Sequence, residues 1–171
     1  MFFHITELEH HPIHFDVNYE AGEIDFGDDL NQRGPLHAAG SAELLPNTLG
    51  EIRLRGLVEV EVMGACCRCL EPASARVVSR FDLFYRPEPK LSGHPEIHLE
   101  EGEIDLSFYT GDGVALAEAM RDFVLLSLPM RLVCRENCQG LCPHCGANRN
   151  IEPCDCRTER IDERWAALKD L

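Results

Sequence analysis

The sequence predicts an α+β fold in which an antiparallel β meander packs against one helix and continues into a cysteine-rich carboxy-terminal module. Residues 50–63 alternate apolar and charged side chains, residues 114–126 repeat apolar side chains about once per helical turn, and nine cysteines gather in short-spaced pairs. The chain has 171 residues, of which 44% are hydrophobic, so it is long and apolar enough to bury a core. A wholly disordered chain is therefore excluded.

Three segments in a row predict the meander. Gly50 to Met63 is the most regular strand, since its even-numbered residues are apolar or glycine and most odd-numbered ones are charged. A weaker strand covers Leu36 to Leu45 and is broken at Pro46, so that the two form a hairpin. Ala73 to Tyr85 is rich in β-branched and aromatic residues and predicts a third strand.

The helices are predicted late in the chain. Val114 to Leu126 has helical spacing and is closed by Pro129. Asp162 to Leu171 predicts a short terminal helix that Asp162 caps. Pro87 to Glu103, rich in proline, glycine and histidine, predicts a loop. We therefore expect an α+β domain at 1–133 and a metal-binding module at 134–171 packed on it.

The charge of the chain limits its possible partners. Its 30 acidic and 16 basic residues give a net charge of -14, and the excess lies in residues 1–60 (-8) and 101–133 (-4). Residues 61–100 and 134–171 carry only -1 each and hold all nine cysteines. A conventional nucleic-acid binder needs a large basic excess, so the balance favours a basic protein partner.

The location of the protein is expected to be the cytoplasm. No apolar run approaches the roughly 20 residues that a membrane-spanning helix needs, and the first residues lack the basic and apolar regions of a signal peptide. The cytoplasm keeps thiols reduced, so disulfides are not expected and metal binding is the first hypothesis for the cysteines.

The cysteine pairs predict two tetrahedral zinc sites. Four thiolates at short spacing match the needs of a structural zinc ion, and the Cys142–Gly146 turn, with its proline and final glycine, is the strongest local signal. The spacing favours one local site and a second one that joins the end of the best strand to the segment after the helix. Cys67 is the odd cysteine and is expected not to bind metal. The predicted ligands are Cys66, Cys69, Cys134 and Cys138 in one site, and Cys142, Cys145, Cys154 and Cys156 in the other.

The same residues have other interpretations. An iron–sulfur cluster, a redox pair, or free or disulfide-bonded cysteines remain alternatives, and a catalytic zinc would keep an open position that two closed sets of four sulfurs do not provide. His10, His11 and His14 are expected to be exposed, and His144 to face solvent. The sequence shows no Ser-His-Asp set, phosphate-binding glycine loop or H-E-x-x-H helix, so no enzyme is predicted.

Several motifs of the chain together resemble those of a known family. The motifs VEVMGACCRCLEP (Val60 to Pro72), EIDL (Glu103 to Leu106), LSLP (Leu126 to Pro129) and GLCPHCG (Gly140 to Gly146), with the remaining cysteines, Asn150 and Asp162 to Leu168, resemble the bacterial YceD-type large ribosomal RNA subunit accumulation proteins. Some members keep the first C-x-x-C and a cysteine pair after the LP segment while lacking the distal turn. That resemblance supports pairing Cys66 and Cys69 with Cys134 and Cys138.

The resemblance implies a non-enzymatic role in the accumulation or maturation of large-subunit ribosomal RNA. The expected partners are a large-subunit precursor or a basic ribosomal protein, with no membrane and no small-molecule substrate. The alternative is a zinc-dependent adaptor or regulatory protein that binds a non-ribosomal basic protein. Contact with rRNA or a partner is expected at Arg68, Arg135, Arg149, Arg157, Arg164 and Trp165.

Overall fold

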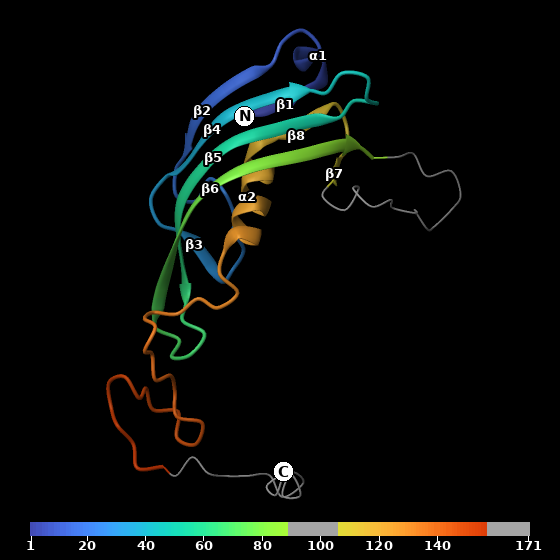
Figure 1. The fold of residues 1–171 in the computed structure, drawn as a ribbon. Helices are drawn as coiled ribbons and strands as arrows, with labels where there is room; N and C mark the ends of the chain where they lie inside the picture. Colours follow the sequence, from blue (N-terminus) through green and yellow to red (C-terminus); the bar gives the residue numbers. More distant parts are fainter. Residues whose placement is uncertain (89–105, 157–171) are drawn as a thin grey trace, which may run out of the picture. The chain divides into compact units, whose positions relative to one another are not determined.

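The computed structural model describes residues 1–88 and 106–156 and confirms the α+β class (Figure 1). The chain forms two compact units, one made of Met1–Gly64 with Ser74–Met130 and the other made of Ala65–Ala73 with the chain from Arg131 onward. The elements in chain order are β1 (Phe2–His4), α1 (Ile5–Leu8), β2 (Ile13–Tyr19), β3 (Leu30–Gln32), β4 (Leu36–Leu44), β5 (Ile52–Ala65), β6 (Pro72–Pro87), β7 (Leu106–Tyr109), β8 (Gly113–Ala115) and α2 (Leu116–Ser127).

The main sheet has the strand order β2-β4-β5-β6-β7, with β3 pairing on β5. The three predicted strands are present as β4, β5 and β6, and β4 and β5 are antiparallel, with Gly40 opposite Gly56. A strand outside the predicted meander extends the sheet at one edge, where β7 runs parallel to β6 with Phe84 opposite Leu106. A parallel partner requires a long return connection, and the chain between Pro87 and Leu106 is long enough to supply one.

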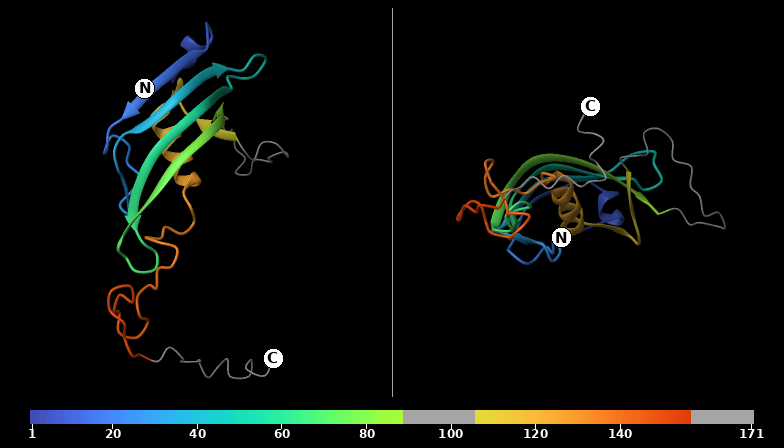
Figure 2. Two further views of the ribbon diagram at one scale, coloured as in Figure 1. Left: turned by 60° about the vertical axis from the view of Figure 1, so that its left-hand side comes forward. Right: turned by 90° about the horizontal axis from the view of Figure 1, so that it is seen from below.

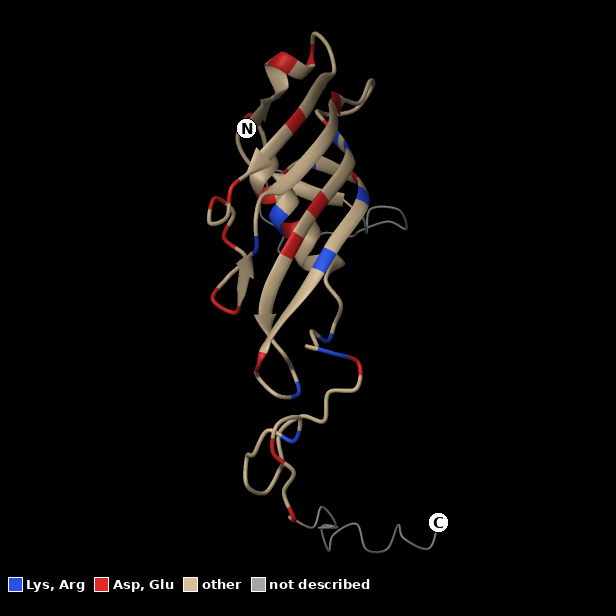
Figure 3. Ribbon diagram, turned by 90° about the vertical axis from the view of Figure 1, so that its left-hand side faces the viewer, with Lys and Arg blue, Asp and Glu red and all other residues tan. Residues whose placement is uncertain are grey.

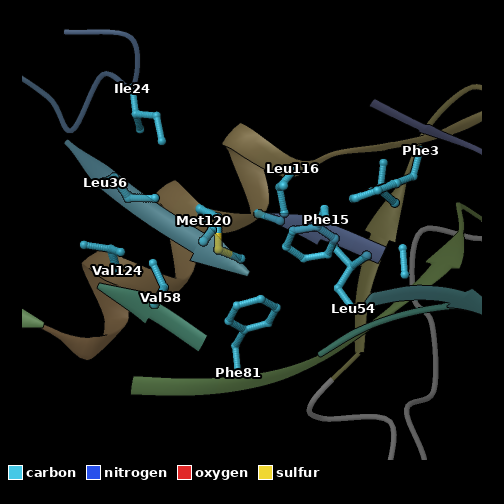
Figure 4. Close-up of a cluster of buried hydrophobic side chains, with 14 of the residues drawn as sticks. Phe3, Phe15, Ile24, Leu36, Leu54, Val58, Phe81, Leu116, Met120 and Val124 are labelled. Atoms are coloured by element: carbon cyan, nitrogen blue, oxygen red, sulfur yellow. The ribbon is translucent and has the colours of Figure 1, made fainter. Parts of the chain in front are cut away.

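Helix α2 lies against the concave face of the curved sheet (Figure 2). The alternation in β5 explains the packing, because its even-numbered residues Ile52, Leu54, Val58, Val60 and Val62 are buried. Figure 4 shows Met120 of α2 among side chains of the sheet, close to Phe15 and Phe81. The largest fully buried side chains of this core are Phe3, Leu36, Ile52, Leu54, Leu116, Met120, Val58, Val60, Val62 and Val124.

Two glycines at the centre of the sheet allow a close approach of their neighbours, and one of them makes room for an aromatic ring. A Cβ atom on Gly56 would lie 2.2 Å from the carbonyl oxygen of Ala39 and 2.8 Å from the ring of Phe81. Gly40, directly opposite, is equally crowded, since a Cβ there would lie 2.1 Å from the carbonyl oxygen of Arg55. Glycine normally weakens a strand, so its presence here reflects this close approach.

The opposite face of the sheet is covered by ion pairs. Arg53 donates two hydrogen bonds of 2.7 Å to Asp82 and lies over the ring of Phe84. The hydrogen bonds from Arg53 lower the pKa of Asp82. Arg76 of β6 forms a similar ion pair with Glu59 of β5. Exposed pairs of this kind contribute little to stability, about 0–1 kcal/mol each, and keep this face hydrophilic.

Helix α2 begins later than the spacing predicts. The predicted helix started at Val114, but Val114 lies in β8, where it pairs with Phe3 of β1. Its backbone is therefore used in a strand pair that joins distant parts of the chain, and the helix starts at Leu116. At the other end Leu128 is extended (φ -67°, ψ 146°), as expected of a residue before proline.

Acidic side chains gather in the connection between β2 and β3 (Figure 3). This connection holds Glu20, Glu23, Asp25, Asp28 and Asp29 and no basic residue. The predicted loop at Pro87 to Glu103 lies outside the described residues from 89 onward, as does all of the predicted terminal helix. Within the part of the chain that the structure describes, no helix has the length and apolarity to cross a membrane.

Candidate metal centres

Four cysteines from two distant segments form the first candidate metal centre, here called the proximal site. Cys66 and Cys69 lie in the loop after β5, and Cys134 and Cys138 lie in the segment that follows α2 in sequence. The Sγ atoms of Cys66 and Cys138 are 3.9 Å apart, and those of Cys69 and Cys134 are 3.6 Å apart. All four sulfurs lie within 4.8 Å of one another, so they can bind a single ion.

The second candidate centre, the distal site, is local in sequence. Its sulfurs belong to Cys142, Cys145, Cys154 and Cys156 and also lie within 4.8 Å of one another. Both groups match the pairing that the spacing favoured.

The two C-x-x-C turns share one backbone geometry. In the proximal turn, Leu70 N–H donates to the carbonyl of Cys66 (2.9 Å), and Cys66 N–H donates to Glu71 (2.8 Å). The distal turn repeats both bonds from Gly146 to Cys142 (2.9 Å) and from Cys142 to Ala147 (2.8 Å). Gly146 has a φ of 74°, which glycine adopts freely.

The residue after the proximal turn is unusual. Leu70 has a φ of 64°, a left-handed conformation that costs a residue with a Cβ atom about 1–2 kcal/mol. The proximal turn therefore takes the same conformation as the distal one without the glycine that marks it in the sequence.

Arg68 fastens the proximal loop to the carboxy-terminal segment. Its guanidinium donates to the carbonyls of Glu136 and Cys138, both at 3.1 Å, and its own carbonyl accepts from Leu141 N–H at 2.9 Å. Gly140 passes so close that a Cβ atom there would lie 3.0 Å from the Arg68 carbonyl oxygen. Arg68, predicted as a contact residue, thus acts within the fold.

The electrostatics of each site favour a cation. Burial opposes ionisation of Cys66, but the backbone N–H groups of Cys134, Arg68 and Cys69 lower the pKa of its thiol to about 6. Although Glu71 N–H works in the opposite direction, burial and the neighbouring sulfurs raise the pKa of Cys69 to about 12. The backbone therefore stabilises one thiolate in the site. Additional thiolates would repel this one, and a bound positive ion removes that repulsion.

The distal site shows the same division. The backbone N–H groups of Cys145 and His144 lower the pKa of Cys142 to about 6. The sulfur of Cys145, followed by burial and the sulfur of Cys142, raises the pKa of Cys156 to about 12. The same backbone donors thus support a thiolate at the first cysteine of each turn.

The spacing of the sulfurs fits a tetrahedral zinc ion. Ligands at about 2.3 Å in tetrahedral directions are about 3.8 Å apart. The two separations of 3.9 and 3.6 Å in the proximal site lie on either side of this value. A small apolar cluster surrounds this site, in which Cys66, Cys69, Ala73 and Cys138 are buried and Leu132, Val133 and Leu141 pack against them.

Asn150 links the distal segment to the proximal sulfurs. Its side-chain amide donates to Cys138 Sγ at 3.4 Å, and its Oδ1 accepts from Gln139 N–H at 2.8 Å. Although burial opposes ionisation, this hydrogen bond and the N–H of Gly140 lower the pKa of Cys138. The cysteine pattern alone does not indicate this residue, because an amide beside a thiolate leaves no spacing signature.

Replacing Asn150 with alanine is expected to weaken metal binding at the proximal site by about 10–100-fold, because a hydrogen-bonded partner of a ligand is lost. Competition with a chromogenic chelator measures the affinity. Asn137→Ala is the matched control, since only the backbone carbonyl of Asn137 makes a hydrogen bond among the described contacts. Equal affinities in the two variants would show that Asn150 has no influence on the metal.

The remaining predicted residues are placed as follows. Cys67 is exposed and belongs to neither group of four sulfurs. Arg135 and Arg149 are exposed, and Arg135 lines a hollow beside Cys134. His10, His11, His14 and His144 are exposed. Arg157, Arg164 and Trp165 lie outside the described residues.

The fold and the two four-cysteine centres define the chain as an α+β protein with a cysteine-rich unit that could hold metal ions. A family model described as large ribosomal RNA subunit accumulation protein YceD matches residues 54–171, which include every cysteine of both centres. The chain belongs to the YceD family.

Individual relatives agree with this assignment. An uncharacterised protein of Mycobacterium tuberculosis is 35% identical to 70% of the chain, covering 55% of the relative. A chloroplastic protein of Arabidopsis thaliana, named large ribosomal RNA subunit accumulation protein YCED homolog 1, is 26% identical over 71% of the chain and 44% of its own length. A maize homologue of the same name is 27% identical over 66% of the chain and 46% of its own length. The chain spans about half the length of these relatives, and no solved structure matches it.

Proposed function

We propose that this protein is a non-enzymatic factor in the biogenesis of the large ribosomal subunit, where it supports the accumulation or maturation of large-subunit rRNA. The observation that carries the proposal is the family match over residues 54–171 together with two closed groups of four cysteines. Closed sulfur sets suit a structural metal, since a catalytic zinc keeps a position free for water or substrate. A cytoplasmic location, where the thiols stay reduced, is part of the proposal.

Zinc is the proposed metal in both sites. Four thiolates in a tetrahedral arrangement suit zinc or an iron–sulfur centre. The sulfur separations of 3.6 and 3.9 Å are those of one ion bound directly by four ligands. The proposed ligands are the eight cysteines of the proximal and distal sites, and the zinc ions hold residues 134–156 and the loop after β5 in one folded unit.

The proposed partners follow from the distribution of charge. The acidic excess in residues 1–60 and 101–133 suits a basic ribosomal protein or a basic region of a large-subunit precursor. Arg135 and Arg149 are exposed near the metal centres and are the proposed contacts to rRNA. Arg68 is a weaker candidate for such a contact, because its guanidinium is already bonded to two backbone carbonyls.

Sedimentation tests the proposed function. In a sucrose gradient of a lysate from cells that express it, the protein is expected to comigrate with precursors of the large subunit, and its depletion is expected to lower large-subunit rRNA relative to small-subunit rRNA. Quantitative immunoblotting and RNA measurement across the gradient provide the two readouts. A protein that stays at the top of the gradient, with unchanged rRNA after depletion, is instead an adaptor for a non-ribosomal partner.

A further inference from the structure

A groove of about 680 Å³ lies between β7, β8 and α2, away from both metal centres in sequence and within the first unit. Its lining combines aromatic rings, small residues (glycine and alanine) and two carboxylates. Its lining includes Phe2, Tyr85, Phe108, Tyr109, Glu118 and Asp122. The cysteine sites and the family assignment leave this groove unexplained.

Two aromatic side chains in the groove are left partly open to solvent. Phe2 is 42% exposed and Phe108 is 44% exposed, although the next residue in each of their strands is buried. Phe2 lies on β1, and its ring contacts that of His4 with a centroid separation of 4.6 Å. Exposed rings beside a concave surface are typical of a binding site for a protein segment.

Two carboxylates face the same groove from one side of helix α2. Glu118 and Asp122 are four residues apart and therefore neighbours on the helix surface, a like-charge arrangement that destabilises the helix. Glu118 in the first turn is favoured by the helix dipole, but that effect does not account for Asp122 beside it.

Both carboxylates act on the phenol that they face. Burial, followed by the charges of Asp122 and Glu118, raises the pKa of Tyr85 to about 12. Asp122 pairs with Arg121 at 3.3 Å, and the Arg121 guanidinium also donates to the carbonyl of Asp25. Among the described residues, no cation pairs with Glu118. The groove thus has a negative charge that its own side chains do not balance.

We propose that this groove binds an arginine- or lysine-bearing segment of a basic protein partner, with one cationic side chain placed between the aromatic rings and the carboxylates of Glu118 and Asp122. Aromatic faces attract cations, and two carboxylates add directed hydrogen bonds to a guanidinium. An RNA segment does not suit the groove, because its phosphates would meet the two carboxylates. The inference rests on the proposed function and deepens it by assigning the surface that a basic ribosomal protein contacts.

The test is an NMR titration of the full zinc-loaded chain with a hexa-arginine peptide at about 0.15 M salt. The largest amide shifts are expected at Tyr109, Gly113 and Ala119, and the double variant Glu118→Gln/Asp122→Asn is expected to raise the Kd by about tenfold or more. The control Asp28→Asn/Asp29→Asn removes the same charge from the acidic connection and is expected to change the Kd by less than about twofold. A hexa-citrulline peptide, which has nearly the same shape without the charge, is expected not to bind.

Equal weakening by the two double variants, or shifts confined to the acidic connection, would overturn the inference, because attraction would then depend on net charge alone. The titration tests binding to the groove alone, whereas comigration of the wild-type protein with large-subunit precursors tests the proposed function. Either proposal can therefore fail without the other. A groove variant that loses the peptide but comigrates as wild type does would overturn the assignment of the ribosomal contact to this groove.

Discussion

Replacing Cys66 with serine is expected to remove one of two zinc ions per chain and to unfold the proximal site, while the distal ion remains bound. Cys66 is fully buried and stands at the centre of a cluster with only a few apolar residues. So small a cluster cannot fold by burial alone. The binding free energy of a structural zinc ion, about 10–16 kcal/mol in small domains, is comparable to the whole stability of a typical protein, about 5–15 kcal/mol.

Elemental analysis and limited proteolysis measure the two parts of this result. The variant is expected to hold one zinc ion and to be cleaved rapidly near Arg68, Arg131 and Arg135. Cys67→Ser is the matched control, because Cys67 is exposed and belongs to neither group of sulfurs. Cys142→Ser is expected to give the reciprocal loss of the distal ion. Loss of both ions from either ligand variant would contradict two independent centres.

Replacing Phe81 with alanine is expected to lower the free energy of unfolding of the first unit by about 3–5 kcal/mol. Phe81 is only 3% exposed and contacts Phe15 in a stacked arrangement and Phe123 edge-on, with ring centroids 6.4 and 5.8 Å away. Its ring fills the space that Gly56 leaves, so truncation opens a cavity that the rigid strand backbones cannot close. Urea denaturation followed by circular dichroism measures the change.

Phe84→Ala on the same strand is the control. Phe84 faces the other side of the sheet, where Arg53 lies over its ring at 5.4 Å. Its removal is expected to cost about 1 kcal/mol or less, because the loss is one exposed cation–π contact. Similar costs for Phe81→Ala and Phe84→Ala would show that the core does not lie between the sheet and α2.

The central strands could be predicted because the sequence alone determines them. In β5 the apolar and charged residues alternate over the whole strand, since one face meets α2 and the other meets solvent. The same pattern is shorter in β2, where Ile13, Phe15, Val17 and Tyr19 turn inward, and the neighbouring histidines and acids mask it in the sequence. Outward positions in a strand tolerate such residues, so the histidines gave no evidence against a strand.

Strand pairings between distant segments could not be predicted. The parallel pairing of β7 with β6 depends on where a long connection returns, and the pairing of β8 with β1 joins the two ends of the first unit. No local pattern in the sequence predicts either strand pairing. The start of α2 was misplaced for the same reason, since the apolar residue Val114 suits a helix and a strand equally well.

The candidate metal centres show the same division. The spacing of the cysteines predicts both groups, because short pairs can place two sulfurs on one ion with little strain. The surrounding contacts were not predicted. Leu70 adopts a left-handed conformation that no feature of the sequence predicts. The hydrogen bonds of Arg68 to backbone carbonyls and of Asn150 to a cysteine sulfur form only in the folded chain.

Native mass spectrometry of the full chain, purified without added metal or chelator, tests the central claim most directly. The account predicts one species whose excess mass equals two zinc ions, with eight protons displaced from the cysteines of the proximal and distal sites. A folded species that carries no metal, or one whose excess mass is that of an iron–sulfur cluster, would contradict it.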